Sequence, residues 1–374
     1  MNNRKIQGNT KKKTRCCVLC ACHAFLPVAF SQSSSEEPTP RGLVGPGQYA
    51  SEAHGPPLNP ESWHVAEDYV LNLDQVWGLR IMPQAVFQVP GGVGLLYNSR
   101  PPSGFRAPKG FARQQTGSLA FSRNLVEWHD YPGNPVLHEV QDWQGSDRAM
   151  PNAMLYDPKR EQWVVYLGIS EGDYSGIRAI SAAYSRDLVN WTYDKGPSLT
   201  IDDFAKAVPA LMKASAKELR TEGRVYANWA LYHEGRYYLG VQGSVVAGRN
   251  RRYENIVLVA DKPAGPFEHA KVESDFTPTR SPVYSNGKWY CAFPGHWDGK
   301  PGFGLAWSEN LLGPYEKSPR NPIIAVETIS RSRPVLFRYD GTWAILFAHF
   351  YDYRDMRLRI ALANIHPSLI DYCP

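Results

Sequence analysis

The chain has 374 residues, of which 43% are hydrophobic and 12% aromatic, and its formal net charge is +5 at pH 7. This excess lies in the first 31 residues, which hold six of the 41 basic residues and no acid, so that 35 basic and 36 acidic residues remain. The balance argues against a nucleic-acid-binding surface, which needs an excess of positive charge. No apolar run of about 18 residues follows the N-terminus, which argues against a membrane-spanning helix.

The N-terminus, residues 1–31, is predicted to be a signal peptide. Basic residues within 11–15 precede an apolar run over 16–30, and Ala29-Phe30-Ser31 offers a small-x-small cleavage site. We therefore expect a secreted or periplasmic protein. The segment LCAC at residues 19–22 loosely resembles a lipid-attachment site, so a lipid anchor is the alternative, and no other association with membranes is expected.

Residues 32–62 are rich in Ser, Pro and Gly and are expected to form a flexible linker. Residues 63–374 form a domain in which one phrase recurs, at 118–137, 181–200, 257–276, 305–324 and, truncated, 360–370. Each copy follows two β-rich runs joined by a turn such as SNG or YDG, a pattern typical of hairpins. Repeated units stack on one another, so we predict an all-β fold, a five-bladed β-propeller closed by a strand near residues 69–73. A β-sandwich, the alternative, gives no reason for the recurrence.

Two further features concern the outside of this domain. Residues 201–220 are rich in helix formers, with Asp202 or Asp203 placed to cap, and they predict a short helical insertion between blades two and three that Pro209 could divide. Cys291 and Cys373 are the cysteines beyond the leader. They could form a disulfide or remain two buried thiols, and their positions in the sequence do not decide between these.

The recurring phrase resembles a signature of known enzymes. SRNLVEW at 122–128 and SRDLVNW at 185–191, together with AGPF at 264–267 and LGPY at 312–315, resemble the five-bladed β-propeller glycoside hydrolases, a group that includes arabinanases, β-xylosidases and fructosidases. The resemblance implies hydrolysis of glycosidic bonds by three carboxylates carried on the inner strands of the first three blades.

The sequence departs from this group at the expected acids. Met82 stands in place of the first acid, Asn152 or Ala153 in place of the second, and Tyr226 or Asn228 in place of the third. We therefore do not expect three-carboxylate hydrolysis at the usual positions. Asn152 and Asn228 are predicted to bind substrate.

Neighbouring side chains are predicted to take over proton transfer. Asp147 precedes the second inner strand, and Arg148 beside it should keep it ionised, which suits a base or nucleophile. Glu222 precedes the third inner strand and is the predicted proton donor. His296 follows the second strand of blade four and is the alternative donor, since imidazole titrates near neutrality, while His349 holds the matching place in blade five and is expected to contact substrate. The structural alternative for each is a solvated loop acid or a hydrogen-bonded histidine.

Every predicted blade also carries an arginine just before or at its inner strand. These residues are Arg80, Arg148, Arg224, Arg280, Arg331 and Arg333. Such positions converge on the axial mouth of a propeller, and clustered guanidinium groups repel one another unless an anion or a protein carboxylate neutralises them. We expect them to bind a uronic acid or a sulfated sugar, the alternative being that each arginine ties its blade to a neighbouring carbonyl or acid.

The sequence therefore predicts a secreted glycoside hydrolase that acts on an acidic poly- or oligosaccharide, its carbohydrate partner, in an arginine-rich axial pocket. The alternatives are a non-catalytic carbohydrate-binding propeller and a polysaccharide lyase that uses Arg with a His or Tyr base. No cofactor is expected, because no HExxH or CxxC motif follows the leader. A structural Ca²⁺ on the axis stays open, since scattered oxygen ligands leave little trace in a sequence.

Overall fold

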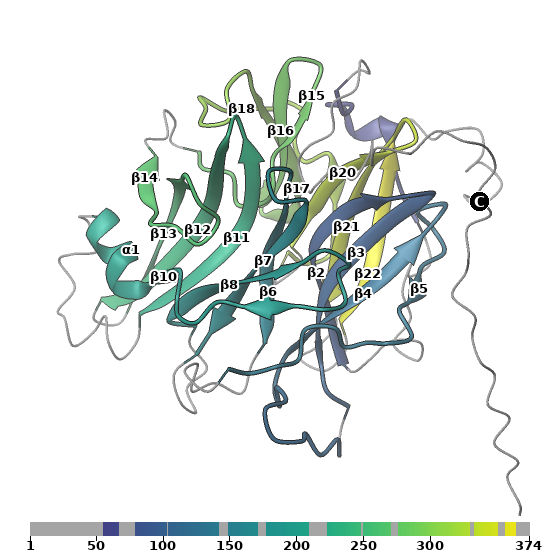
Figure 1. Cartoon of the computed structure of the whole chain (residues 1–374). Coiled ribbons are helices and arrows are strands. Elements are labelled where there is room, and N and C mark those ends of the chain that lie inside the picture. Colours follow the sequence, from purple (N-terminus) through teal and green to yellow (C-terminus); the bar gives the residue numbers. More distant parts are fainter. Residues whose placement is uncertain are drawn as a thin grey trace, which may run out of the picture. The chain divides into compact units, whose positions relative to one another are not determined.

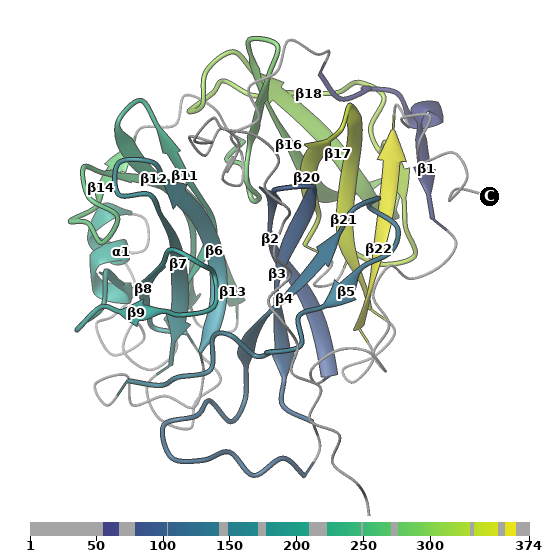
Figure 2. The ribbon, with the colours of Figure 1, turned by 45° about the vertical axis from the view of Figure 1, so that its right-hand side comes forward.

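The computed structural model describes residues 55–66, 79–102, 104–141, 149–170, 177–208, 223–247, 250–270, 276–329, 333–350 and 356–363. Within them, five separate antiparallel sheets follow one another along the chain, which confirms the predicted five-bladed β-propeller (Figures 1 and 2). The predicted signal peptide lies outside the described residues, as does the predicted linker up to residue 54. No helix in the described part of the chain is long and apolar enough to cross a membrane.

Each sheet is a meander whose first strand is the innermost. The first is β2 (Leu79–Val89), β3 (Gly92–Arg100), β4 (Thr116–Ser122) and β5 (His129–Asp130). The second is β6 (Met150–Asp157), β7 (Gln162–Ile169) and β8 (Ala179–Ser185), with β9 (Thr192–Tyr193) and β10 (Leu199–Thr200) both pairing with β8. The third is β11 (Arg224–His233), β12 (Arg236–Ala247), β13 (Asn250–Ala260) and β14 (Glu268–Ala270).

The remaining two sheets complete the ring. The fourth is β15 (Val283–Ser285), β16 (Lys288–Trp297) and β17 (Lys300–Ser308), with β18 (Glu316–Lys317) and β19 (Ile324–Ala325) both pairing with β17. The fifth is β20 (Val335–Tyr339), β21 (Thr342–Phe350), β22 (Met356–Ala363) and β1 (Trp63–Val65), which follows the short 3₁₀ helix η1 (Pro60–Ser62). The fifth sheet thus takes its last strand from the other end of the chain.

The N-terminal strand closes the ring, although not at the residues that we expected. Trp63 pairs with Ala363 and Val65 with Ala361, so β1 forms the outer edge of the last sheet. Residues 69–73, where we expected this strand, lie outside the described residues.

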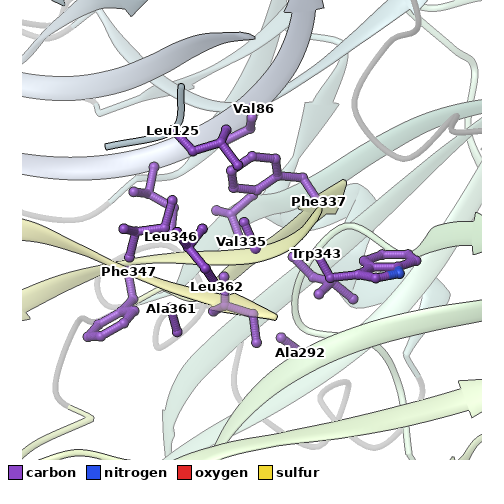
Figure 3. Close-up of a cluster of buried hydrophobic side chains, with 14 of the residues drawn as sticks. Val86, Leu125, Ala292, Val335, Phe337, Trp343, Leu346, Phe347, Ala361 and Leu362 are labelled. Atoms are coloured by element: carbon purple, nitrogen blue, oxygen red, sulfur yellow. The ribbon is translucent and has the colours of Figure 1, made fainter. Parts of the chain in front are cut away.

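Buried apolar side chains fill the boundaries between blades. One cluster lies between the first and second blades, one between the second and third, and one between the third and fourth. A larger cluster joins the fifth blade to both of its neighbours: Figure 3 shows Val86 of β2 and Ala292 of β16 packed around Trp343, Leu346 and other side chains of the fifth blade. Such continuous burial supplies the main driving force for closing the ring.

The predicted helical insertion is present as one short helix. The helix α1 (Ile201–Ala207) follows β10 and precedes β11 in the chain, and Thr200 caps it while Asp203 hydrogen-bonds back to the Thr200 backbone, forming a capping box. The rest of the predicted helical segment, from Pro209 to Glu222, lies outside the described residues.

The recurring phrase builds a turn. The side chain of Asn124 accepts hydrogen bonds from the backbone N–H groups of Val126 and Glu127 at 3.1 and 2.8 Å. Asp187, at the same place in the second blade, accepts the two equivalent bonds at 2.9 and 2.8 Å. Such turns, in which an Asn or Asp side chain accepts from the backbone that follows it, reverse the chain between strands.

A leucine and a tryptophan complete each of these turns. Leu125 and Leu188 both have positive φ angles, 68° and 67°. The indole N–H of Trp128 donates to the Leu125 carbonyl at 2.7 Å, and that of Trp191 donates to the Leu188 carbonyl at 2.9 Å. In both of these blades the phrase thus turns the chain back toward the outermost strand. Its recurrence there has a structural reason.

Replacing Asp187 with alanine is expected to destabilise the protein by about 1 kcal/mol, because two backbone N–H groups lose their acceptor. Asp187→Asn is the matched control, since Asn124 makes the same bonds in the first blade. Urea denaturation of both variants checks this, and equal loss in the two would contradict the role of the side-chain oxygen.

Acid should weaken the same turn. Burial acts to raise the pKa of Asp187, but hydrogen bonds from Asn190, Val189 and Ser185 outweigh it and lower that pKa to about 2. A carboxylate whose pKa is lowered in the folded state stabilises the fold above its unfolded pKa of about 3.9, and this contribution is lost as the pH falls toward 2.

The buried thiol Cys291 belongs to the core. It is free and packs in the cluster between the third and fourth blades, and burial raises its pKa. Of the two alternatives, a disulfide or a buried thiol, Cys291 is therefore a buried thiol. Cys373 lies outside the described residues.

Candidate functional site

Three inner strands carry a β-bulge at matching places, and each bulged residue has an amide side chain. The register of β2 shifts between Pro83 and Ala85, that of β6 between Pro151 and Ala153, and that of β11 between Ala227 and Trp229. A bulge leaves one residue out of the ladder and re-aims its side chain. The residues left out are Gln84, Asn152 and Asn228.

This register corrects the alignment of the first blade. Gln84, and not Met82, is the structural counterpart of Asn152 and Asn228. Met82 instead packs against the large hydrophobic cluster of the fifth blade. The signal in the sequence was the pair Pro83-Gln84, which matches Pro151-Asn152, because proline is favoured at bulges where it need not donate to the ladder.

The axis of the propeller holds a small cavity that all five blades line. Its volume of about 10 Å³ leaves room for roughly one water molecule, so the axis is packed and not an open channel at this depth. The lining residues are Gln84, Ala85, Val86, Ala153, Met154, Asn228, Trp229, Ala230, Arg280, Ser281, Val335 and Leu336.

Two arginines lie at this cavity, Arg280 as a lining residue and Arg333 through its bond to the lining residue Gln84. Arg333 donates a hydrogen bond from Nη1 to Oε1 of Gln84, and Arg280 donates one from Nη1 to the carbonyl of Thr279. Trp229 fixes the segment that carries Arg280, since its indole N–H donates to the Pro278 carbonyl at 2.7 Å. Side chains from the first, third, fourth and fifth blades thus meet at one place.

The electrostatics of this pair favour an anion. Burial lowers the pKa of Arg280 to about 9, and the charge of Arg333 acts in the same direction. Burial also lowers the pKa of Arg333, against a smaller opposing effect of Tyr226. Both groups remain charged at neutral pH, and among the described residues no carboxylate contributes to either shift. Bringing a negative group between them would relieve their mutual repulsion.

The strand β11 presents a polar face beside the arginines. Arg224, Tyr226 and Asn228 alternate with buried residues, so the three share the less buried face of the strand. Tyr226 is close enough to Arg333 to affect its pKa. Arg224 itself does not line the axial cavity.

Two asparagines are buried beside this site. Asn98 of β3 and Asn152 of β6 are each 1% exposed, and within the described ranges neither amide has a hydrogen-bond partner. Asn98 pairs with Gly117 across the first blade, and Gly117 packs on Pro151, next to Asn152. A buried amide without partners costs about 1–3 kcal/mol, so a polar ligand that bonded these groups would gain affinity.

The absence of a side chain at Gly168 leaves the room for Asn152. A Cβ at Gly168 would lie 2.9 Å from Asn152 Nδ2 and 2.7 Å from Ile177 Cδ1. Gly168→Ala should therefore displace the Asn152 amide and cost about 1–3 kcal/mol of stability through overpacking. Gly196→Ala is the control, because a Cβ there meets nothing within 4 Å. Thermal unfolding of both variants checks this, and equal melting temperatures would contradict the crowding at Asn152.

The predicted histidines take different places. His296 is exposed, lies near the end of β16 opposite Pro301, and does not line the axial cavity. His349 is buried in β21, with Nε2 at 3.6 Å from a carboxylate oxygen of Glu327. His349 thus lies within ion-pair distance of Glu327, and neither histidine is among the residues that line the axial cavity.

Several predicted site residues cannot be placed. Asp147, Arg148, Glu222 and Arg331 lie outside the described residues, and Arg80 is a backbone member of β2 whose side chain is not described. Their roles stay predictions. Among the residues described, no group of three or more His, Cys, Asp or Glu side chains could hold a metal ion.

Comparison with known proteins rests on structure alone. No family model matches the chain, and no curated protein sequence matches it. An α-L-arabinofuranosidase from Podospora anserina, solved in complex with cellotriose, superposes with a TM-score of 0.50 at 11% identity, covering 82% of this chain and 98% of that one. The fold is that of the five-bladed β-propeller glycoside hydrolases.

Two further solved structures are similar. The catalytic domain of a family 62 α-L-arabinofuranosidase from Coprinopsis cinerea has a TM-score of 0.49 at 11% identity, covering 81% of this chain and 97% of that one. A family 117 glycoside hydrolase from the marine bacterium Zobellia galactanivorans has a TM-score of 0.49 at 12% identity, covering 82% and 91%. Because one fold hosts many activities, the function has to be argued from the side chains.

Proposed function

We propose that the protein is a secreted or periplasmic carbohydrate-active enzyme that binds an acidic glycan, with uronate or sulfate groups, at the mouth of the propeller axis above the packed cavity, beside Arg280 and Arg333, and hydrolyses its glycosidic bonds. The observation that carries this proposal is the convergence of Arg280 and Arg333 on the axis with no described carboxylate acting on either. Guanidinium groups bind carboxylate and sulfate through paired, charge-assisted hydrogen bonds.

The amides supply the neutral part of the same site. Gln84, Asn152 and Asn228 offer both donors and acceptors, which suits the hydroxyl groups of a sugar. In hydrolysis one group protonates the leaving glycosidic oxygen while another takes a proton from the attacking water. Amides perform neither step, so the proposal assigns proton transfer to the loop residues Asp147 and Glu222.

A specific observation favours a lyase as the second candidate. Tyr226 lies near Arg333 on the polar face of β11. In that reaction a base removes the proton next to the carboxylate of a uronate, the arginine neutralises the carboxylate, and the glycosidic oxygen leaves with a double bond formed in the sugar. The three amides favour the other alternative, a binding propeller without catalysis.

Product analysis separates these candidates. The protein is incubated with uronate-containing and sulfated oligosaccharides, and the products are weighed by mass spectrometry. A hydrolase adds one water per cleavage, a lyase leaves an unsaturated sugar that absorbs in the ultraviolet, and a binding protein gives no product. Binding of neutral oligosaccharides only, with no affinity for acidic ones, would overturn the proposal.

Arg280→Ala tests the anionic ligand directly. Loss of one charged hydrogen bond should weaken binding of an acidic oligosaccharide by about 1.5–3 kcal/mol. Isothermal titration calorimetry measures this, with the neutral, carboxyl-reduced oligosaccharide as the control ligand. An equal loss for both ligands would mean that the substitution perturbs the fold and not the recognition of charge.

A further inference from the structure

A second polar groove lies between the second and third blades, at the opposite end of β6 from Asn152. Its volume of about 560 Å³ is within the range of roughly 300–1,000 Å³ usual for ligand sites. One wall is formed by β8 and β9 with the turn between β6 and β7, and the other by residues 262–265, the turn that follows β13. No residue lines both this groove and the axial cavity, so the two are separate.

Basic side chains dominate the groove. Three separate turns each contribute one cation, and a single acid is present among the lining residues. These four are Arg160, Arg186, Lys262 and Asp194. The remaining polar lining is neutral and includes Gln162 and Thr192, which suit sugar hydroxyls. The groove therefore combines an excess of positive charge with hydrogen-bonding groups.

Buried side chains of the second blade hold both walls of the groove in place. Arg160 Nη1 lies 3.3 Å from Oδ2 of Asp157, whose side chain is fully buried, while the Arg160 side chain remains 47% exposed. The hydroxyl of Tyr166 donates to the Pro263 carbonyl at 2.8 Å, which ties the opposite wall to the same blade. Holding the charged groups in place before a ligand arrives reduces the entropy lost on binding.

Asp194, the acid of the groove, is hydrogen-bonded to a tyrosine of the same wall. The hydroxyl of Tyr184 donates to Oδ2 of Asp194 at 2.9 Å. Burial raises the pKa of Asp194, against a smaller lowering by the Tyr184 hydrogen bond. One oxygen of Asp194 is thus occupied by Tyr184, and Arg160 is paired with Asp157, which leaves Arg186 and Lys262 as the cations of the groove with no ion pair among the described residues.

The first blade provides an internal comparison. Arg123 stands at the place of Arg186 in the recurring phrase, and it is exposed. However, the turn between β2 and β3 is Pro90-Gly91, which has no counterpart of Arg160, and Tyr131 stands where Asp194 does. The basic groove is therefore a feature of the boundary between the second and third blades and not of the repeat.

We propose that this groove is a secondary binding site for the sulfate or carboxylate groups of an anionic glycan chain, separate from the axial site. The inference stands on the groove's own residues, so it does not require the axial site to be catalytic. A glycan that is bound at both the groove and the axial site gains affinity, because after the first contact forms the second is intramolecular.

The test uses the double variant Arg186→Ala/Lys262→Ala of the full chain. Arg160 is left in place because its loss would leave the buried Asp157 carboxylate without its cation. The probes are a heparin-derived hexasaccharide, its desulfated counterpart and sodium sulfate, titrated by calorimetry in the Arg280→Ala background. Arg123→Ala is the matched control for the loss of an exposed arginine.

We expect the double variant to raise the Kd for the sulfated hexasaccharide about tenfold or more, since each charged hydrogen bond is worth that factor. Arg123→Ala should leave the Kd unchanged, and added salt should weaken binding. If sodium sulfate binds to the groove as tightly as the hexasaccharide does, the ligand is a free anion and not a glycan.

Three outcomes would overturn the proposal. They are an unchanged Kd in the double variant, an equal rise in Arg123→Ala, and no binding of any probe. If binding disappears with Arg280→Ala alone while Arg186→Ala/Lys262→Ala binds as the unmodified chain does, the axial site stands and the groove does not. If the reverse is found, the groove stands and the proposed axial function fails.

Discussion

Replacing Trp343 with alanine is expected to lower the free energy of unfolding by about 3–5 kcal/mol, the usual cost of deleting a large buried aromatic side chain. Trp343 is 1% exposed and packs edge-on against Tyr290 of the fourth blade, with ring centroids 6.2 Å apart. It also pairs with Ala363, the residue on which Trp63 of the closing strand docks. The cavity would therefore open beside the pairing of β1 with β22 that closes the ring.

Tyr253→Ala is the control for this variant. Tyr253 is 58% exposed, and truncation of an exposed side chain usually changes stability by less than about 0.5 kcal/mol. Guanidinium denaturation of both variants, followed by tryptophan fluorescence and circular dichroism, measures the difference. A loss below about 1 kcal/mol in Trp343→Ala would mean that the ring closes without the packing shown in Figure 3.

The blades were predictable because their signals are local and repeated. Each hairpin turn and each copy of the phrase lies within one stretch of sequence, so the count of five follows without long-range information. The hydrogen bonds of Asn124 and Asp187 show what the phrase does in the first two blades: it encodes the turn toward the outermost strand. The same reason makes the phrase informative about fold and silent about substrate.

The bulges were not predicted, and they decide the site. A bulge shifts the alternation of a strand by one residue, so a pattern that is read with a period of two assigns the following side chains to the wrong face. The sequence pattern placed Met82 at the first acid position, whereas in the structure Gln84 is the counterpart of Asn152 and Asn228, and the partly buried Met82 packs against apolar neighbours.

The arrangement of the arginines was predicted only in part. The sequence predicted that they gather at the axial mouth. Of the six, Arg280 lines the axial cavity, and Arg333 donates to Gln84, which also lines it. Their contacts with Gln84 and Thr279 depend on side-chain rotamers that no repeat encodes. The groove between the second and third blades had no sequence signal for the same reason: its cations come from three turns far apart in the chain.

Glu222→Gln is expected to reduce turnover of an acidic glycan by at least about 100-fold, the lower end of what a general acid contributes, while leaving the Kd nearly unchanged. The described inner strands supply amides at the three bulges, and an amide cannot release a proton to a leaving oxygen. Glu222 lies two residues before Arg224, the first residue of β11, which brings the chain to the axial site at Asn228. A proton donor is needed at that mouth, and glutamine keeps the size of the side chain while removing the acid.

Glu234→Gln is the matched control, because Glu234 follows the other end of the same strand and its side chain is 80% exposed. It should keep full activity, whereas Glu222→Gln should also lose the fall in rate at alkaline pH that deprotonation of a general acid produces. Single-turnover rates and calorimetric Kd values on one uronate oligosaccharide measure both effects. Full activity in Glu222→Gln would exclude this residue as donor and make His296 the next to replace. If His296→Asn is also fully active, proton donation by either side chain is excluded, and the lyase reaction with Tyr226 as base becomes the mechanism that the remaining residues support.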